Sequence, residues 1–386
     1  MKDSETEVAV VGAGPAGSTA AETLAKRGID VVLIDRKSEI GSPVQCGGFL
    51  PETHELRSLL PRAMLPASLL DIPNRCILHR TRLQRIYSPS GKHKEFPVDG
   101  RVLDRRAFDR YLAYRAARAG ATLLPKTRAS LILPGLMLSG HRSGGLSADV
   151  IIGADGPSST VARAAGISEA SLVGVCIEYE MADVAIDPEA AEMYFGSKVA
   201  PGGYAWIIPL SHDLANVGVG VRVSHLTTGS KIRQVLDGFI HNHPVAKELL
   251  GRGEVLAVMR GVVPADGMPR SIQRESVLLA GDAAGQVMAT SGGGIPLAMV
   301  AGRVAAEVAY RFLREGGSLD DYRSQIDIEI GREIANSVRI RRLVDRIMQN
   351  DMLLSALFSM LSPDQMKAIQ RGQIPEALSR MISDLI

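Results

Sequence analysis

Gly12-Ala13-Gly14-Pro15-Ala16-Gly17 joins a short apolar run, Glu7–Val11, to a segment with helical periodicity, Ser18–Lys26. The apolar run is typical of a buried parallel strand, so the glycines lie at a strand-to-helix turn. The first glycine permits the tight turn, the second lets the backbone approach a diphosphate, and the third lets helix and strand pack closely. Because the helix N-terminus adds free N–H groups and partial positive charge, the stretch predicts a dinucleotide-binding fold. Asp35 ends the next strand, where its carboxylate can accept hydrogen bonds from ribose hydroxyls.

The composition limits the possible functions. The chain has 386 residues, of which 44 are basic and 42 acidic, so its formal net charge is only +2. This balance, together with an aromatic content of 4%, argues against a protein that binds nucleic acid. The 39 glycines and the 46% of apolar residues suit an α/β enzyme with many tight turns. The length exceeds what one core normally serves, so we expect two unequal, interleaved lobes.

The cysteines and the apolar segments bear on the cellular compartment. The chain has three widely spaced cysteines, Cys46, Cys76 and Cys176. This odd number and wide spacing fit neither a disulfide framework nor a zinc site, so we expect no metal. This usage favours a reducing cytoplasm. Charged residues lead directly into the first strand, so no signal peptide is predicted. The longest apolar segments, such as 295–301 and 352–361, are too short or too interrupted to span a bilayer.

Two further apolar strands end in small residues and an aspartate, at Gly153-Ala154-Asp155-Gly156 and at Gly281-Asp282. Ligands of open α/β sheets gather at such carboxyl ends. Between these strands, alternating apolar residues with intervening glycines predict antiparallel strands. We therefore expect a mixed α/β fold, in which a Rossmann-type lobe is interleaved with a mixed β-sheet substrate lobe. The predicted Rossmann-type domain comprises 1–171 and 264–320 with inserted segments at 42–100 and 131–147, the substrate domain comprises 172–263, and a helical region comprises 321–386.

Candidate contact residues occur in a loop and at helix starts. Cys46 precedes two glycines in a Gly- and Pro-rich loop, where thiol and backbone can approach a flat ligand; a small buried side chain in a turn is the alternative. Arg105 lies in the first turn of a predicted helix, where the helix dipole disfavours a positive charge. We therefore expect Arg105 to face an anion or a carboxylate; a solvated charge on the surface is the alternative. Three glycines before Pro296 leave bare N–H groups at another helix start.

The segment Pro201–Pro209 contains the only tryptophan of the chain. Tyr204 and Trp206 are two residues apart, so in a strand both point to one face. That face is either a ligand wall or a buried edge between the lobes. Beyond residue 321, helices with apolar stripes either pack on the body of the protein or contact a membrane surface through a basic cluster of Arg339, Arg341, Arg342 and Arg346.

Several of these elements occur together in one known fold. The glycine turn with its aspartate, the helix start at Arg105, Gly153–Gly156 and Leu278–Gly285 resemble, in order and spacing, the flavoprotein fold of the aromatic hydroxylases. The stretches Ser42–Gly48 and Pro201–Pro209 narrow the resemblance to the geranylgeranyl reductase family, which includes archaeal enzymes acting on digeranylgeranylglycerophospholipids. The resemblance implies a lobe that holds FAD, a mixed sheet that covers the isoalloxazine ring, and saturation of isoprenoid double bonds.

The resemblance also implies which residues contact FAD. At the adenosine end, these would be Gly12, Gly14, Ala16 and Gly17 at the pyrophosphate, Asp35 at the ribose, and the backbone of Ala129 at the adenine. At the flavin end, they would be Arg105 at the phosphate and ribityl region, Asp282 at a ribityl or pyrophosphate oxygen, the backbone N–H groups of Gly294 and Ile295 at the pyrimidine edge, and Cys46 and Gly47 beside the ring.

The expected reaction reduces an isolated, trisubstituted double bond with a hydride from N5 of reduced FAD and a proton. Since an unactivated alkene cannot accept negative charge, this chemistry needs a dry apolar pocket and a well-oriented flavin. The expected substrate-binding residues are Tyr204, Trp206, Pro201 and Pro209, and Cys46 is the candidate for tuning the flavin or relaying the proton. Many relatives carry Cys-Gly-Glu-Gly where this chain has Cys46-Gly47-Gly48-Phe49, which leaves the identity of the substrate open.

Other functions are compatible with the same fold. The first alternative is an FAD-dependent monooxygenase or halogenase, and the second is an electron carrier or lipid-binding module without turnover. A Ser/His/Asp hydrolase is disfavoured, because the chain has no Gly-x-Ser-x-Gly elbow. The expected partners are an isoprenoid lipid and an electron donor, for which a ferredoxin, a deazaflavin and NADPH all remain open. Peripheral contact with the inner membrane surface is also expected.

Overall fold

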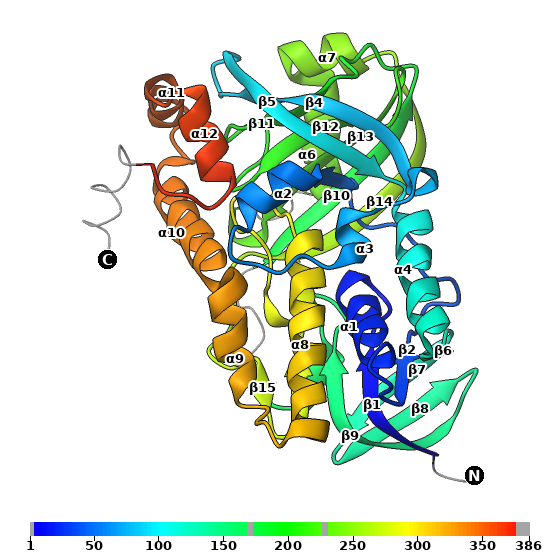
Figure 1. The fold of residues 1–386 in the computed structure, drawn as a ribbon. Helices are drawn as coiled ribbons and strands as arrows, with labels where there is room; N and C mark the ends of the chain where they lie inside the picture. Colours follow the sequence, from blue (N-terminus) through cyan, green and yellow to red (C-terminus); the bar gives the residue numbers. More distant parts are fainter. Residues whose placement is uncertain (1–3, 168–172, 226–230, 376–386) are drawn as a thin grey trace.

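The computed structural model describes residues 4–167, 173–225 and 231–375, which form two large sheets with helices around them (Figure 1). In the first sheet, the parallel strands are ordered β16 (Val277–Leu279), β9 (Gly144–Gly153), β1 (Ser4–Val11), β2 (Val31–Ile34) and β6 (Thr122–Leu124). Antiparallel additions are the edge strand β15 (Gln273–Arg274) and a hairpin beside β9, made of β7 (Thr127–Ile132) and β8 (Gly135–Gly140).

The middle of the first sheet is buried on both faces, and the central residues of β1 have no exposed surface. A continuous apolar run suits this position in a parallel sheet. α1 (Pro15–Ala25) follows β1 directly and packs against α4 (Arg105–Ala119) and α8 (Ile295–Glu315). Gly302 lets α8 cross α1 at close range, because a Cβ atom at this position would overlap with the carbonyl oxygen of Ala16.

The second sheet lies at the top of Figure 1 and is mostly antiparallel. Its order is β14 (Glu254–Pro264), β10 (Val173–Ala182), β13 (Leu214–Arg222), β12 (Tyr204–Pro209), β11 (Ala190–Tyr194), β4 (Ile77–Tyr87), β5 (His93–Leu103) and β3 (Phe49–Pro51). β11 and β4 are parallel neighbours. The sheet thus combines strands of the expected substrate domain with three strands from the segment expected as an insertion, and the mixed α/β fold class is confirmed.

The two faces of the second sheet have different neighbours. α6 (Ile232–Asn242) and α7 (Pro244–Leu250) pack on one face, where they share an apolar core with Ile177 and Tyr179 of β10. Side chains alternate between faces along a strand. Glu178 therefore points to the opposite face, which is turned toward the first sheet and the C-terminal helices.

The C-terminal helices run along one side of the molecule and return over the second sheet (Figure 1). Ile340 and Leu343 of α10 share a core with Ile86 and Phe96 of the second sheet. The expected helices after residue 321 are thus present as far as residue 370, while 376–386 lie outside the described residues. These helices are α9 (Asp321–Ile326), a π-helical turn (Asp327–Gly331), α10 (Arg332–Ile347), α11 (Asp351–Met360) and α12 (Pro363–Gln370).

The shorter elements connect the sheets. They are the α-helices α2 (Thr53–Leu59), α3 (Ala67–Leu70) and α5 (Thr160–Ala164), and the 3-10 turns Asn74–Cys76, Val223–His225 and Gly281–Ala284. Within the described ranges, none of the helices combines the length and the apolar character that a bilayer crossing requires.

Candidate functional site

The helices α1 and α8 begin without a side-chain cap, whereas α4 begins with one. In α4, the Asp104 carboxylate accepts hydrogen bonds from the N–H groups of Arg106 and Ala107. Within the described residues, no side chain accepts from the first turn of α1 or of α8, whose N-cap residues are Gly14 and Gly294. Their N–H groups and dipole charge are therefore available to an anionic or electron-rich ligand.

The three glycines of the first turn have separate roles. Gly12 has a φ of 105°, and a Cβ atom there would overlap with the carbonyl oxygen of Ala154 in the neighbouring strand end. A Cβ atom at Gly17 would overlap with the carbonyl oxygen of Gly12, so this glycine permits the close packing of helix and strand. A Cβ atom at Gly14 would meet nothing within 4 Å. The turn is thus tightly packed behind and open in front, where a diphosphate fits.

Asp35 lies beside the glycine turn, as its spacing predicts. Its carboxylate accepts hydrogen bonds from the N–H groups of Ala13 and Lys37, each at 2.8 Å. A carboxylate can accept further hydrogen bonds, so a ribose hydroxyl remains possible as a third donor. The Asp35 carbonyl accepts from the N–H of Thr127, which starts β7. This bond brings Ala129, the residue expected at the adenine, to the same edge of the sheet.

Ala16, Asp282 and Gly294 lie where α1 and α8 meet. The side chain of Ala16 packs beside Gly281, so only its backbone is available to a ligand. A Cβ atom at Gly294 would lie 3.3 Å from Oδ1 of Asp282, which places this carboxyl at the N-terminus of α8. Burial raises the pKa of Asp282 to about 6, against the opposing effect of Arg105.

Arg105 is a buried cation rather than a solvated surface charge. Its side chain is only 14% exposed, and it donates to both carboxylate oxygens of Asp109, at 3.1 and 3.0 Å. Burial opposes the charge, but Asp109 and the nearby Cys46 thiol outweigh burial and hold the pKa of Arg105 above its ordinary value. Arg105 therefore joins the α4 start, the Cys46 loop and the Asp282 region at one point.

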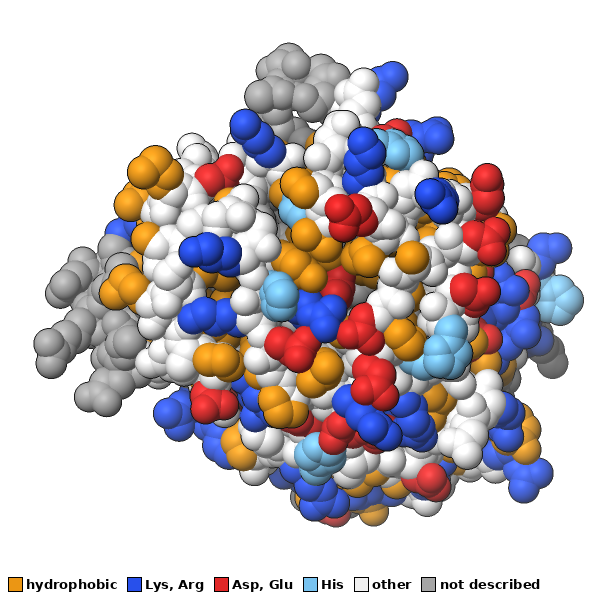
Figure 2. All heavy atoms as spheres, turned by 90° about the horizontal axis from the view of Figure 1, so that it is seen from above, with side chains coloured by type: hydrophobic (Ala, Val, Ile, Leu, Met, Phe, Trp, Pro, Cys, Tyr) orange, Lys and Arg blue, Asp and Glu red, His pale blue; other side chains and the backbone are white. Residues whose placement is uncertain are grey.

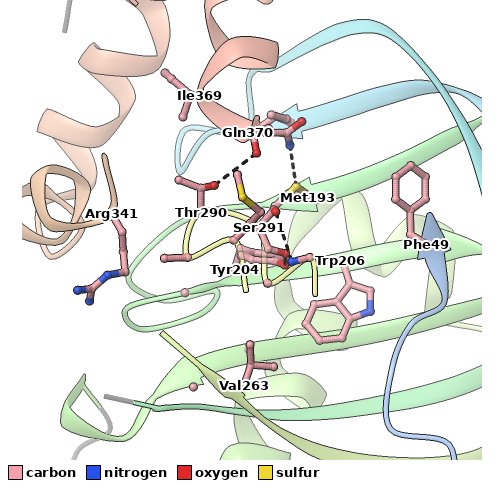
Figure 3. A pocket seen from close by; sticks show the side chains of 18 of the residues that line it. Phe49, Met193, Tyr204, Trp206, Val263, Thr290, Ser291, Arg341, Ile369 and Gln370 are labelled. Carbon is pink, nitrogen blue, oxygen red and sulfur yellow. Dashed lines mark hydrogen bonds between the residues drawn. The ribbon is translucent and has the colours of Figure 1, made fainter. Parts of the chain in front are cut away.

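A cavity of about 430 Å³ lies between the second sheet, the loop around Cys46, the start of α8 and helices α10–α12 (Figure 3). This volume is typical of a small-molecule site. It is lined by Cys46, Gly47, Gly294 and Ile295, which are the residues expected beside the flavin. α12 covers another side of it, where the carbonyl oxygen of Gln370 accepts from the hydroxyl of Thr290, in the loop before α8, and the side-chain amide of Gln370 donates to the sulfur of Met193 (Figure 3).

A row of aromatic rings forms one wall of the cavity. The ring centroids of Trp206 and Tyr204 are 5.8 Å apart, those of Tyr204 and Phe195 5.7 Å, and those of Phe195 and Phe358 5.5 Å. The Tyr204 hydroxyl donates to the carbonyl oxygen of Ser291 in the loop before α8 (Figure 3). The wall thus runs from the α8 start to α11, which favours the ligand-wall interpretation of Tyr204 and Trp206.

Trp206 is fixed by a residue that the sequence analysis missed. Its indole N–H donates to Oδ1 of Asn216 on β13 at 2.7 Å. Gly47 packs against this pair, since a Cβ atom there would lie 2.9 Å from Ile208, 3.2 Å from Asn216 and 3.4 Å from Trp206. Gly218 makes room for the indole ring, with which a Cβ atom at 218 would overlap. The glycines that alternate along β13 were the only local signal of this arrangement.

Pro201 and Pro209, which the sequence analysis assigned to the substrate site, are not among the residues that line the cavity. Pro209 is an odd-numbered residue of β12 and points away from the face that carries Tyr204 and Trp206. Pro201 precedes the strand, and its carbonyl accepts from the N–H of Arg222. Their expected contact with substrate is therefore not supported by their positions.

Phe49 does line the cavity. Its ring lies over Gly100 of β5, where a Cβ atom would approach the ring carbons to 2.5 and 2.6 Å. Gly48 thus stands where Cys-Gly-Glu-Gly has its acid, and Phe49 adds an apolar ring to the cavity wall.

Comparison with known proteins identifies the family. The sequence profile of the geranylgeranyl reductase catalytic domain matches residues 173–263, and that of an FAD binding domain matches residues 5–58. A digeranylgeranylglycerophospholipid reductase of Methanothrix thermoacetophila is 34% identical over 95% of this chain and 94% of its own. The chain belongs to the geranylgeranyl reductase family. The predictions of FAD as cofactor and of a flavin-dependent oxidoreductase are thereby confirmed.

Solved structures agree with this assignment. A geranylgeranyl bacteriochlorophyll reductase-like protein from Thermoplasma acidophilum is 28% identical, with a TM-score of 0.84 over the full length of both chains. A flavin-dependent brominase is 15% identical over 99% of this chain and 98% of its own, with a TM-score of 0.76, which shows the fold alone. The two uncapped helix N-termini and the open space before Gly14 fit the diphosphate and the flavin of FAD.

Proposed function

We propose that this protein saturates isolated double bonds in the geranylgeranyl chains of a membrane ether-lipid precursor. Its membership of the geranylgeranyl reductase family and the printed activity of its relatives support this substrate class. The observation that carries the proposal is the continuous apolar cavity that leads from the start of α8 to α11 along four aromatic rings.

Bound and reduced FAD would supply the hydride. The backbone N–H groups of Gly14, Ala16 and Gly17 would hold its diphosphate, and those of Gly294 and Ile295 would bind the pyrimidine edge of the flavin. The cavity wall, with Tyr204 and Trp206, would exclude water, which would otherwise trap positive charge that develops on the alkene.

The remaining predicted contacts have positions that are consistent with this placement. Arg105 and Asp282 would lie at the phosphate and ribityl region, and Asp35 and Ala129 at the adenosine. Cys46 and Gly47 would lie beside the flavin ring, where Cys46 is a candidate for tuning the flavin or relaying a proton.

Peripheral membrane contact would deliver the lipid. Met352, Leu353 and Met360 of α11 are largely exposed, and α11 also contributes Leu357 and Phe358 to the cavity. Apolar side chains stand out at the left-hand edge of Figure 2, on the side where α11 lies in Figure 1. We place this edge against the inner membrane surface, with exposed arginines of α10 near the headgroups, namely Arg339, Arg342 and Arg346.

Anaerobic turnover tests the proposed function. Dithionite-reduced holoenzyme is mixed with a geranylgeranyl lipid, and flavin oxidation is followed together with the mass of the lipid. Oxidation that depends on lipid and adds two hydrogens per reduced bond supports the proposal. In a parallel reaction with air, transfer of oxygen or halide to the substrate indicates a monooxygenase or a halogenase. Oxidation of the flavin without any lipid product indicates an electron carrier.

The same assay identifies the site and the electron donor. We expect Cys46→Ala and Trp206→Ala to lower the rate, and Cys76→Ala, whose thiol does not line the cavity, to leave it near wild type. Undiminished rates in the first two variants would remove both residues from the site. Replacing dithionite in turn by reduced ferredoxin, reduced deazaflavin or NADPH distinguishes the three donor classes.

A further inference from the structure

Carboxyl groups are rare in the wall of the cavity, and among the described residues they come from Glu55, Glu178 and Glu192. Glu55 forms ion pairs with Lys367, at 3.0 Å, and with Arg371. Both oxygens of the Glu55 carboxylate are therefore held by cations.

Glu192 also has a partner at each of its two oxygens. One of its oxygens accepts from Arg85 at 2.6 Å, and the other accepts from the hydroxyl of Tyr194. Both oxygens are therefore occupied by structural partners, which leaves Glu178 as the lining carboxyl in a different electrostatic situation.

Glu178 is buried without an ion-pair partner among the described residues. Its residue is 2% exposed, and Oε2 has no hydrogen-bond partner there although it is inaccessible to solvent. A buried, unpaired carboxylate is costly, so the neutral form is favoured. Burial raises the pKa of Glu178 to about 7, against the opposing effects of Asn216 and Arg105.

The carboxyl lies beside the aromatic wall. A Cβ atom at Gly218 would overlap with the indole of Trp206 and would lie 2.9 Å from Cβ of Glu178, so the two side chains flank the same glycine. Asn216 lies near the Glu178 carboxyl, because it opposes the rise in the pKa of this group. Because Oδ1 of Asn216 accepts from Trp206, the amide N–H₂ is the group that faces Glu178.

The other titratable groups around Glu178 are poor sources of a proton or are positively charged. Cys176, two residues earlier on the same face of β10, has a thiol pKa that burial, then Glu178 and Cys46, raise to about 12. Arg105, which approaches from α4, remains a cation through its pairing with Asp109. Glu178 is thus a carboxyl in the cavity wall that holds a proton near neutral pH, and its buried Oε2 has no hydrogen-bond partner among the described residues.

We propose that Glu178 donates the proton that completes reduction of the double bond; this inference rests on the proposed function. The O–H bond of the carboxyl breaks, and the π electron pair of the alkene forms a C–H bond with that proton at the less substituted carbon. The hydride that reduced FAD supplies brings its own electron pair to the other carbon. The Glu178 carboxylate regains a proton from water after the product leaves.

Turnover of Glu178→Gln tests this role. The variant keeps the shape of the side chain but has no acidic proton, and general acid catalysis typically contributes about 10²- to 10⁴-fold, so we expect a loss in kcat of that order. FAD affinity, measured by flavin fluorescence in the oxidised protein, should stay within about threefold of wild type. Glu180→Gln is the matched control, because Glu180 follows on the same face of β10 but does not line the cavity. Glu178→Asp should retain part of the activity.

Infrared spectroscopy gives a readout that does not require turnover. In FAD-free wild-type protein, the C=O band of a protonated carboxyl should disappear with a midpoint near pH 7. The band with the midpoint near pH 7 should be missing from Glu178→Gln and present in Glu180→Gln, whereas the band of Asp282, whose pKa is raised to about 6, should remain in both variants. Absence of this band in wild type, or turnover of Glu178→Gln within about threefold of wild type, would overturn the inference.

The two proposals fail in distinguishable ways. If wild type reduces no prenyl lipid under any donor, the proposed function is wrong and the proton has no alkene to reach. If wild type reduces the lipid and Glu178→Gln does so equally, the proposed function stands and the inference about Glu178 is wrong.

Discussion

The indole N–H of Trp206 donates to Oδ1 of Asn216 at 2.7 Å, across two adjacent strands of the second sheet. The bond fixes the orientation of both side chains, because Oδ1 is occupied and the amide N–H₂ is directed to Glu178. Gly47 packs on the same bond from the loop that begins at Cys46. One hydrogen bond therefore connects the loop that contains Cys46, the aromatic wall and the buried carboxyl.

Asn216→Ala should disconnect these parts. Leaving the buried indole N–H unpaired costs about 1–3 kcal/mol of folding free energy, which denaturant titration measures. Because Trp206 is the only tryptophan of the chain, its fluorescence reports the change directly, and we expect a shifted emission maximum together with lower turnover. Asn242→Ala, at an exposed position of α6, is the control and should change neither. An unchanged emission spectrum in Asn216→Ala would contradict the connection.

Gly47→Ala should disturb the loop without removing any polar group. The new methyl group would press on Ile208 and on the Trp206–Asn216 bond, and such overpacking typically costs about 1–3 kcal/mol. We expect weaker FAD binding and a changed tryptophan spectrum. Gly238→Ala, in α6, has no atom closer than 3.9 Å to the added carbon and should leave FAD binding unchanged. Equal FAD affinity in the two variants would show that the loop tolerates a side chain at 47.

Titration of Glu178 predicts a specific dependence of stability on pH. Its pKa is raised from 4.5 to about 7 in the folded protein, so the folded chain holds a proton that the unfolded chain has lost. The contribution to the free energy of unfolding is therefore fully present below about pH 4.5 and is lost as the pH rises to about 7. It is on the order of 3 kcal/mol. Glu178→Gln should remove this slope from the FAD-free protein, and Glu180→Gln should keep it; parallel stability curves for wild type and Glu178→Gln would count against the shifted titration.

Which features the sequence predicts depends on whether they are local. The glycine turn, the position of Asp35 and the start of α8 are each determined by a few consecutive residues, and all were predicted. That β4 joins the second sheet depends on its parallel pairing with β11, in which Leu83 lies opposite Ala190. Nothing in either segment alone specifies this pairing.

The polar part of the site was not predictable for a related reason. Glu178 and Asn216 are single polar residues in alternating strands, and such residues usually face solvent. Only the pairing of β10, β13 and β12, with Glu178 opposite Gly218 and Gly218 opposite Trp206, brings them together. Conversely, Pro201 and Pro209 belong to the stretch on which the family resemblance rests, but neither lines the cavity. Pro209 points to the opposite face of β12, and Pro201 lies before the strand.

If α11 contacts the membrane, substitutions on it should weaken binding to lipid vesicles without weakening the binding of FAD. Met352 and Met360 are 83% and 82% exposed, and burying a methionine side chain in lipid is worth roughly 1.5–3 kcal/mol. Replacing both by Glu adds repulsion from anionic lipid, so we expect at least about tenfold weaker binding to anionic vesicles in a flotation assay. FAD affinity should be unchanged, since neither residue lines the cavity.

Met137→Glu is the matched control for this change, because Met137 is also exposed but lies on β8 of the first sheet, away from α11 (Figure 1). It should leave vesicle binding near wild type. With lipid presented in vesicles, the double α11 variant should turn over slowly, whereas with detergent-dispersed lipid its rate should recover, because the reaction site is intact and only delivery is impaired. Equal loss in both forms of lipid would show that α11 acts on the cavity itself and not as the contact with the membrane.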